Sequence, residues 1–225
     1  METNALIENL STEVRPVARL GAPRRRLGLW LLVALPYAAL LLYLYRDHAA
    51  PGLAETMSSP RYLIEQAAAF LTAITAAYAA FVSLVPGSDK RILWLPLVPL
   101  ALWLASIGAG CVQDWLRLGP AALSLRLDTG CLVPMLLVGV VPAGAMIAML
   151  RRGAPLMPRL SFVLGGLAVA GLVNFVLQLF HAGDLTVMIL VWHIGLLLVV
   201  VLVAGWLGPR LLRWNRLKPR AKAAI

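Results

Sequence analysis

The sequence carries little charge for its length. Only 13% of its 225 residues are Asp, Glu, Lys or Arg, whereas a soluble domain carries roughly a quarter. Apolar residues make up 61% of the chain, and a helix that crosses a bilayer needs about 20 consecutive residues of this kind. This composition excludes an ordinary soluble domain and indicates an integral membrane protein.

Motifs for catalysis and for cofactor binding are also missing. The chain has no His-rich metal motif on a helix, no Gly-rich phosphate loop and no nucleophile elbow. Its three histidines, His48, His181 and His193, are too few and too scattered to indicate haem ligation. We therefore expect neither an enzyme nor a bound cofactor.

What the chain does have is a series of long apolar runs. Each is expected to be a helix, because a helix satisfies its own backbone hydrogen bonds in hydrocarbon, and the alternation typical of a barrel is absent. The expected spans are 27–45, 62–85, 92–112, 129–150, 160–181 and 185–208. The predicted fold class is an all-α integral membrane bundle of six transmembrane helices (27–208), between an amphipathic segment (1–26) and a basic tail (209–225).

The basic residues are distributed unevenly along this pattern. Sixteen of the twenty fall in the N-terminal segment, the second and fourth connections and the tail. Since Lys and Arg accumulate in cytoplasmic segments, both termini are expected in the cytoplasm, most simply at a bacterial inner membrane. Short basic clusters between apolar runs are typical of membrane loops, so direct nucleic-acid binding is not expected. The first run lacks a convincing cleavage site and is interpreted as an uncleaved span.

The N-terminal segment has the apolar spacing of a short amphipathic helix. Leu6, Ile7, Leu10 and Val14 recur at helical intervals among charged residues. Two interpretations are open: a helix lying on the inner membrane surface, or a helix offered to a cytoplasmic protein partner.

Alanines fill the second expected span. Eight of them lie between Ala67 and Ala80. Membrane helices approach closely through such small side chains, so we expect this span to pack against its neighbours.

Strongly polar residues of the spans fall in the outer half of the expected bundle. Glu65 lies near the outer end of the second span, and Asn174 and Gln178 share one face of the fifth. His193 is expected at a similar depth in the sixth span, about 12 Å below the outer surface. Buried polar groups usually face the bundle interior or a water-filled cavity. These residues indicate either a polar pocket open to the periplasm or hydrogen bonds that fix the bundle.

The two cysteines, Cys111 and Cys131, are both expected at the outer surface. Three interpretations are open. The pair could form a structural disulfide, since the periplasm is oxidising, or remain two inert thiols. It could also respond to oxidants or to soft metals, with His181 and Asp184 of the next outer loop as further ligands.

Several stretches, in order along the whole chain, resemble the NrsF-like family of bacterial six-span membrane anti-sigma factors. One is the exit of the third span, Gly108 to Pro120, with its sequence GAGCVQDWLRLGP. The others are the start of the chain through Arg15-Pro16-Val17 to Arg24-Arg25-Arg26, the stretch 151–159, Phe180-His181 and 191–195.

The resemblance implies a regulator that holds an extracytoplasmic-function sigma factor at the membrane. Heavy-metal or oxidative stress would release it, with Cys111 and Cys131 as the sensing pair. Leu6, Ile7, Leu10 and Val14 would form the sigma-binding element, to which the loops at 86–91 and 151–159 could add contacts. The alternatives are a small-solute or metal transporter, using a pocket of Glu65, Asn174 and His193, and a purely structural membrane subunit.

Overall fold

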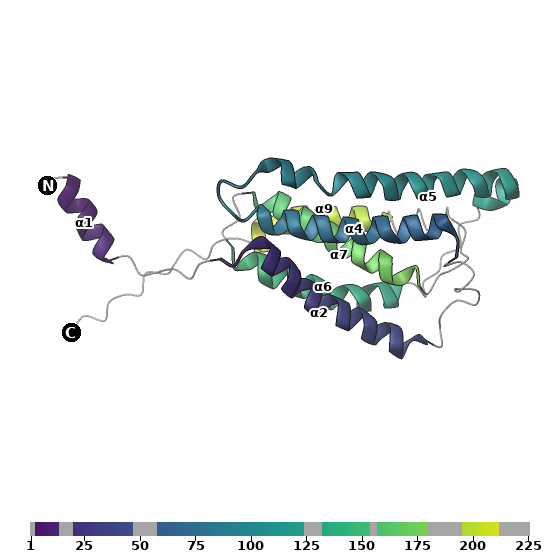
Figure 1. Ribbon diagram of the computed structural model, residues 1–225, viewed down its shortest axis with the longest axis horizontal. Helices are drawn as coiled ribbons and strands as arrows, with labels where there is room; N and C mark the ends of the chain where they lie inside the picture. The colour runs from purple at the N-terminus through teal and green to yellow at the C-terminus, as the bar shows by residue number, and fades with distance from the viewer. Residues whose placement is uncertain are drawn as a thin grey trace.

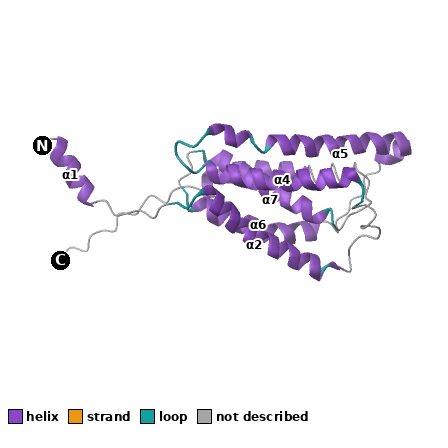
Figure 2. Ribbon diagram, viewed as in Figure 1, coloured by secondary structure: helices purple, strands orange, loops and turns teal. Residues whose placement is uncertain are grey.

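The part of the chain that the structure describes consists of helices joined by loops. The computed structural model describes residues 3–13, 20–46, 58–123, 132–153, 157–179 and 195–211. Within these ranges there are helices and loops and no β-strand (Figure 2). The helices are α1 (Thr3–Glu13), α2 (Pro23–Leu44), α4 (Pro60–Val82), α5 (Leu97–Leu118), α6 (Leu132–Arg151), α7 (Pro158–Leu177) and α9 (Gly195–Leu211), with short 3-10 helices η2 (Lys90–Trp94) and η3 (Gly119–Leu123).

Five of these helices are long and apolar enough to cross a membrane. They are α2, α4, α5, α6 and α7, with α5 counted as part of the continuous stretch Lys90–Ala121. The sixth expected span is described only from Gly195 onward, as α9. Its apolar part, Leu198–Arg210, is shorter than the five helices above. The all-α class is confirmed for the described residues, and the count of six spans stays a prediction.

The helices form an elongated bundle with α4 and α7 at its centre (Figure 1). The helix α7 packs against α4, α6 and α9, while α4 also packs against α5 and α2. Helices α2 and α7 begin, and α4, α6 and α9 end, at the left of Figure 1. We call this the basic end, because it carries Arg24–Arg26, Arg151, Arg152, Arg159 and Arg210. The other end is called the opposite end.

Small residues allow α4 and α7 to approach closely. Seven of the eight alanines named above are fully buried, and only Ala67 is exposed. Opposite them, an added Cβ on Gly171 would lie 3.1 Å from the carbonyl oxygen of Ala69 and 3.1 Å from the backbone nitrogen of Ala73. The predicted packing face is therefore confirmed, and it is completed by a glycine of α7.

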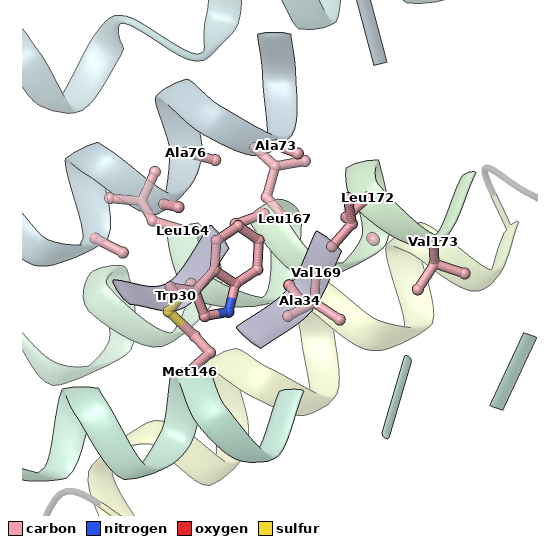
Figure 3. Close-up of a cluster of buried hydrophobic side chains, with 14 of the residues drawn as sticks. Trp30, Ala34, Ala73, Ala76, Met146, Leu164, Leu167, Val169, Leu172 and Val173 are labelled. Atoms are coloured by element: carbon pink, nitrogen blue, oxygen red, sulfur yellow. The ribbon is translucent and has the colours of Figure 1, made fainter. Parts of the chain in front are cut away.

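Aromatic side chains join α2 to α6. The Trp30 ring is fully buried in the core (Figure 3), and its indole N–H donates to the carbonyl of Pro142 at 3.0 Å. The Tyr37 hydroxyl donates to the carbonyl of Leu137 at 2.7 Å. Both acceptors are backbone carbonyls of α6, so these two hydrogen bonds connect α2 directly to α6.

Two helix boundaries differ from the prediction. The helix α5 continues to Leu118, where Gly119 ends it with a φ of 58°, so it extends six residues beyond the end of the expected span 92–112. Cys111 consequently lies about 10 Å inside the end of α5, not at its end. At the other boundary, α2 begins at Pro23. Arg24–Arg26 are thus part of the helix rather than of the segment before it.

Candidate functional site

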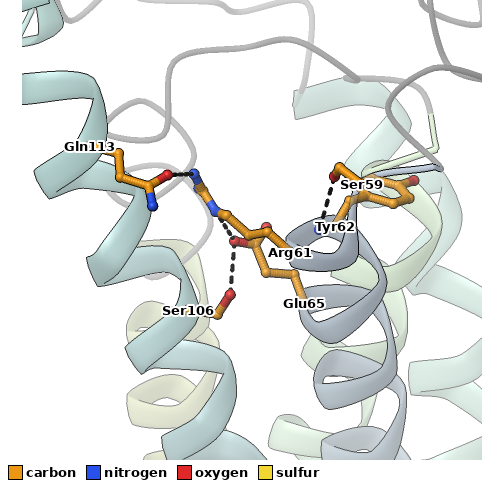
Figure 4. A network of polar contacts seen from close by, with 6 residues as sticks. All are labelled: Ser59, Arg61, Tyr62, Glu65, Ser106 and Gln113. Carbon is orange, nitrogen blue, oxygen red and sulfur yellow. Dashed lines mark hydrogen bonds and ion pairs between the residues drawn. The ribbon is translucent and has the colours of Figure 1, made fainter. Parts of the chain in front are cut away.

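A charged network joins α4 and α5 near the opposite end of the bundle. The Arg61 guanidinium forms a salt bridge with Glu65 at 2.9 Å, one helical turn further along α4. From α5, the Ser106 hydroxyl donates to the same carboxylate oxygen at 3.2 Å, and the Gln113 amide oxygen accepts from Arg61 at 3.4 Å (Figure 4). The sequence predicts Glu65 as a site residue, but not the other three members of this network, Arg61, Ser106 and Gln113. The spacing of four between Arg61 and Glu65 is a signal that could have found the ion pair.

The start of α4 sets the position of this network. The Ser59 hydroxyl caps the helix by accepting from the backbone N–H of Tyr62 at 3.2 Å, and Pro60 occupies the first turn (Figure 4). Both residues are favoured at these positions, because Ser supplies an acceptor and Pro lacks a donor that would otherwise be unsatisfied. Arg61 and Glu65 therefore lie within the first two turns of a helix whose N-terminus is capped.

Gly110 brings the network next to Cys111. The Arg61 guanidinium lies so close to Gly110 that a Cβ added there would overlap it. The next residue, Cys111, is a half-buried free thiol. The described member of the predicted sensing pair thus lies beside a structured ion pair.

A second polar cluster joins α4 to α7. The Gln66 amide donates to the Tyr62 hydroxyl at 2.9 Å, and this hydroxyl donates to the backbone carbonyl of Gln178 at 3.3 Å. Asn174 donates to the carbonyl of Ala170 in its own helix at 2.9 Å. Interhelical hydrogen bonding, one of the two interpretations given above, is therefore present among these residues.

Three buried amide oxygens of this second cluster lack hydrogen-bond partners among the described residues. They belong to Gln66, Asn174 and Gln178, each more than nine-tenths buried. Leaving a buried acceptor unpaired costs about 1–3 kcal/mol. These oxygens can accept hydrogen bonds from a donor that enters the bundle here.

The single polar pocket expected from the sequence is divided in the structure. Glu65 bonds toward α5, whereas Asn174 lies on α7 and Gln178 directly follows α7, which packs on another side of α4. Cys131, His181, Asp184 and His193 lie outside the described residues, so their roles stay predictions. Within the described ranges, no three His, Cys, Asp or Glu side chains are grouped as a metal site would require.

The basic end contains a buried arginine, Arg26, whose burial is not predicted from the sequence. Arg26 is 6% exposed, donates to the backbone carbonyl of Met149 and lies 4.7 Å from the centre of the Phe81 ring. Its Nη1 atom has no hydrogen-bond partner among the described residues. A strongly polar residue is therefore also buried at the basic end, where Arg26 contacts both α6 and α4.

A hydroxyl pair joins α4 to α7 at the same end. The Ser83 and Ser161 hydroxyls are buried and 2.7 Å apart. Together with Arg26, this pair gives the basic end its own interhelical polar contacts. Polar contacts are thus present at both ends of α4.

The N-terminal helix is confirmed as a helix over Thr3–Glu13 and lies outside the bundle (Figure 1). Its Ile7 side chain is 59% exposed. Leu6 and Leu10 lie on the same helix, and Val14 lies outside the described residues. The helix therefore presents at least one large apolar side chain to its surroundings.

These features define a helical bundle of the kind expected for a membrane protein, with polar clusters inside it and an exposed helix at its start. Residues 10–214 match the model of the family NrsF, described as "Negative regulator of sigma F". The chain belongs to this family, which confirms the resemblance inferred from its motifs. The family description indicates a negative regulator of a sigma factor, and it suggests a regulator rather than an enzyme. No curated protein and no solved structure matches the chain.

Proposed function

We propose that this protein is a membrane-bound anti-sigma factor. It would hold an extracytoplasmic-function sigma factor at a bacterial inner membrane and release it under heavy-metal or oxidative stress. The observation that carries the proposal is the family match over residues 10–214, which names a negative regulator of a sigma factor. The five long apolar helices support the membrane location.

The distribution of charge supports the proposed orientation. The basic end carries Arg24–Arg26, Arg151, Arg152, Arg159 and Arg210, and cytoplasmic segments of membrane proteins accumulate such residues. With this end inside, α1 and the loop 86–91 face the cytoplasm, where a sigma factor is present. Cys111 then lies toward the periplasm.

The proposed output surface is α1 with Leu6, Ile7, Leu10 and Val14. An exposed apolar side chain on a short helix suits insertion into a groove of a protein partner. Ile7, at 59% exposure, is the described residue that supports this role. The loops at 86–91 and 151–159 would add contacts at the same end.

The proposed input is the pair Cys111 and Cys131. Cys111 is a half-buried free thiol beside the Arg61–Glu65 ion pair. Oxidation or metal binding at this thiol would change the charge and volume next to a network that joins α4 to α5. A signal can shift the bundle only if it favours one of two arrangements. A difference of a few kcal/mol between the two arrangements would be sufficient.

A crosslinked pull-down from membranes tests the proposed function. The full chain is compared with a variant lacking residues 1–20, and with Ile7→Asp against the matched control Asn4→Asp on the same helix. A sigma factor recovered with the full chain and the control, but lost with the truncation and Ile7→Asp, is the expected result. Recovery of no sigma factor with any variant would overturn the proposal.

A transporter is the alternative from another class. It would use Glu65, Asn174 and His193 in one pocket, yet Glu65 and Asn174 belong to different clusters. No observation among the described residues favours transport over regulation. We therefore do not propose it.

A further inference from the structure

An apolar groove runs between α6 and α9 in the half of the bundle nearer the basic end. Its volume is about 300 Å³, and every residue that lines it is apolar or glycine. On α9 the rim residues Val199 and Val203 are 54% and 47% exposed, so the groove opens to the outside of the bundle.

The groove exists because α6 and α9 both pack on α7 without extensive contact with each other in the described residues. Gly165 and Gly166 form its floor, since both line it from α7. An added Cβ on Gly165 would lie 3.1 Å from Leu150 of α6, and one on Gly166 would lie 3.2 Å from Ala204 of α9. A larger side chain at either position would occupy the space between the flanking helices.

Three arginines lie on the same helix faces as residues that line the groove, one each on α6, α7 and α9. Arg151 follows Ile147 by four residues on α6, and Arg159 precedes Phe162 by three residues on α7. Arg210 follows Leu207 by three on α9. Residues three or four apart share a helix face, so all three arginines lie at the end of the groove, and all three are exposed.

The charge at this end of the groove is unbalanced. None of Arg151, Arg159 and Arg210 forms an ion pair with another described residue. In the sequence, the stretches 151–159 and 209–225 contain no acidic residue at all. Arg210 stacks on Trp206 at 3.8 Å and donates to its backbone carbonyl at 3.0 Å. A tryptophan beside a basic residue is typical of the level of lipid headgroups.

We propose that this groove binds one anionic phospholipid of the cytoplasmic leaflet, an inference that rests on the membrane location given under the proposed function. One acyl chain of the lipid occupies the groove over Gly165 and Gly166, and the phosphate of the lipid is held by Arg151, Arg159 and Arg210. Basic pockets between helices on the cytoplasmic side favour anionic headgroups. A cytoplasmic protein could pair with the arginines but would not fill an apolar groove that runs away from them into the membrane.

Titration of the delipidated full chain in detergent, read by native mass spectrometry, tests this site. The probes are phosphatidylglycerol and phosphatidylcholine with the same acyl chains. One phosphatidylglycerol is expected to bind in preference to phosphatidylcholine. Arg151→Gln and Arg159→Gln should each weaken its binding about fivefold, because one basic residue near the headgroup contributes about that factor. Arg117→Gln, an exposed arginine near the opposite end, is the matched control and should leave the binding unchanged.

Two further variants test the apolar part of the site. Ala143→Phe fills the groove from α6 and should remove the bound lipid, whereas Ala148→Phe, exposed on the same helix but outside the groove, should not.

Equal binding of the two lipids, or equal losses with Arg117→Gln and Arg151→Gln, would overturn the proposal. So would loss of sigma-factor capture with unchanged lipid binding in Arg151→Gln and Arg159→Gln, which would make this end a protein-docking surface. Selective lipid binding by a chain that captures no sigma factor would leave this inference standing and refute only the proposed function.

Discussion

The guanidinium of Arg61 on α4 lies directly against the backbone of Gly110 on α5, immediately before Cys111. A methyl group at Gly110 would displace this guanidinium, the same group that forms the salt bridge with Glu65. A Gly→Ala change in the interior of a helix normally stabilises a protein by roughly 0.5–1 kcal/mol. We therefore predict that Gly110→Ala loses this gain, or destabilises the protein, when Arg61 is present.

The measurement is unfolding of the purified chain in detergent, carried out as a double-mutant cycle. In an Arg61→Ala background, Gly110→Ala should become stabilising. The matched control is Gly108→Ala, because nothing lies within 4 Å of a Cβ added there, and its effect should be the same in both backgrounds. Identical effects of Gly110→Ala with and without Arg61 would contradict the prediction.

The close approach of α4 and α7 makes Gly171 intolerant of larger side chains. Its nearest neighbours across the interface are backbone atoms of Ala69 and Ala73, which cannot rotate away. Gly171→Leu is therefore expected to destabilise the bundle by about 1–3 kcal/mol or more, the usual cost of overpacking. Thermal unfolding in detergent measures the change. Gly144→Leu, where a Cβ meets nothing within 4 Å, should be tolerated, and a similar loss in both variants would refute the role of this contact.

The buried Trp30 is expected to contribute through its hydrogen bond as well as its packing. Trp30→Phe keeps an aromatic ring but removes the donor to Pro142. We expect a loss of about 1–2 kcal/mol, from one hydrogen bond and from a partly unfilled volume. Trp94→Phe serves as the control because Trp94 is 69% exposed, and it should change the free energy of unfolding little. A loss at Trp94 as large as that at Trp30 would show that ring size alone decides the effect.

The proposed sensing pair predicts a regulatory phenotype without a folding defect. Cys111→Ser combined with Cys131→Ser should insert into the membrane at the normal level, which immunoblotting of membranes checks. Expression of the sigma-dependent genes should then stay in one state when cells are treated with cadmium or hydrogen peroxide. Normal induction in the double variant would exclude the dithiol mechanism.

The sequence predicted the helices well and the arrangement of polar side chains less well. The apolar runs were sufficient to predict the helices, and the alanines were sufficient to predict the packing face of α4, because burial follows hydropathy and residue size. The end of α5 was placed too early, since Gln113 and Asp114 interrupt the apolar run although the helix continues. The Gly119-Pro120 dipeptide is a helix-stop signal that marks its true end.

The division of the expected pocket has an equally simple cause. Glu65 and Gln66 are adjacent, and adjacent residues on a helix point about 100° apart at 3.6 residues per turn. One side chain therefore bonds to α5, and its neighbour belongs to the cluster with α7. Which neighbour lies on which side of α4 is a matter of tertiary packing, and no periodicity of a single chain contains that information. Arg26 was missed for the same reason, because its burial depends on Phe81 and Met149 from two other helices.

The helix α4 contains no glycine, and its only proline is in the first turn, whereas α2, α6 and α9 each have a proline inside them. It runs without interruption for 23 residues, a length of about 34 Å. Glu65 lies near one end and Phe81, under the Arg26 guanidinium, near the other. Without a glycine or an internal proline, α4 lacks the residues at which helices usually kink. We therefore expect a rotation of α4 that begins beside Cys111 to be carried along the helix toward Arg26, at the end of the bundle where α2 begins.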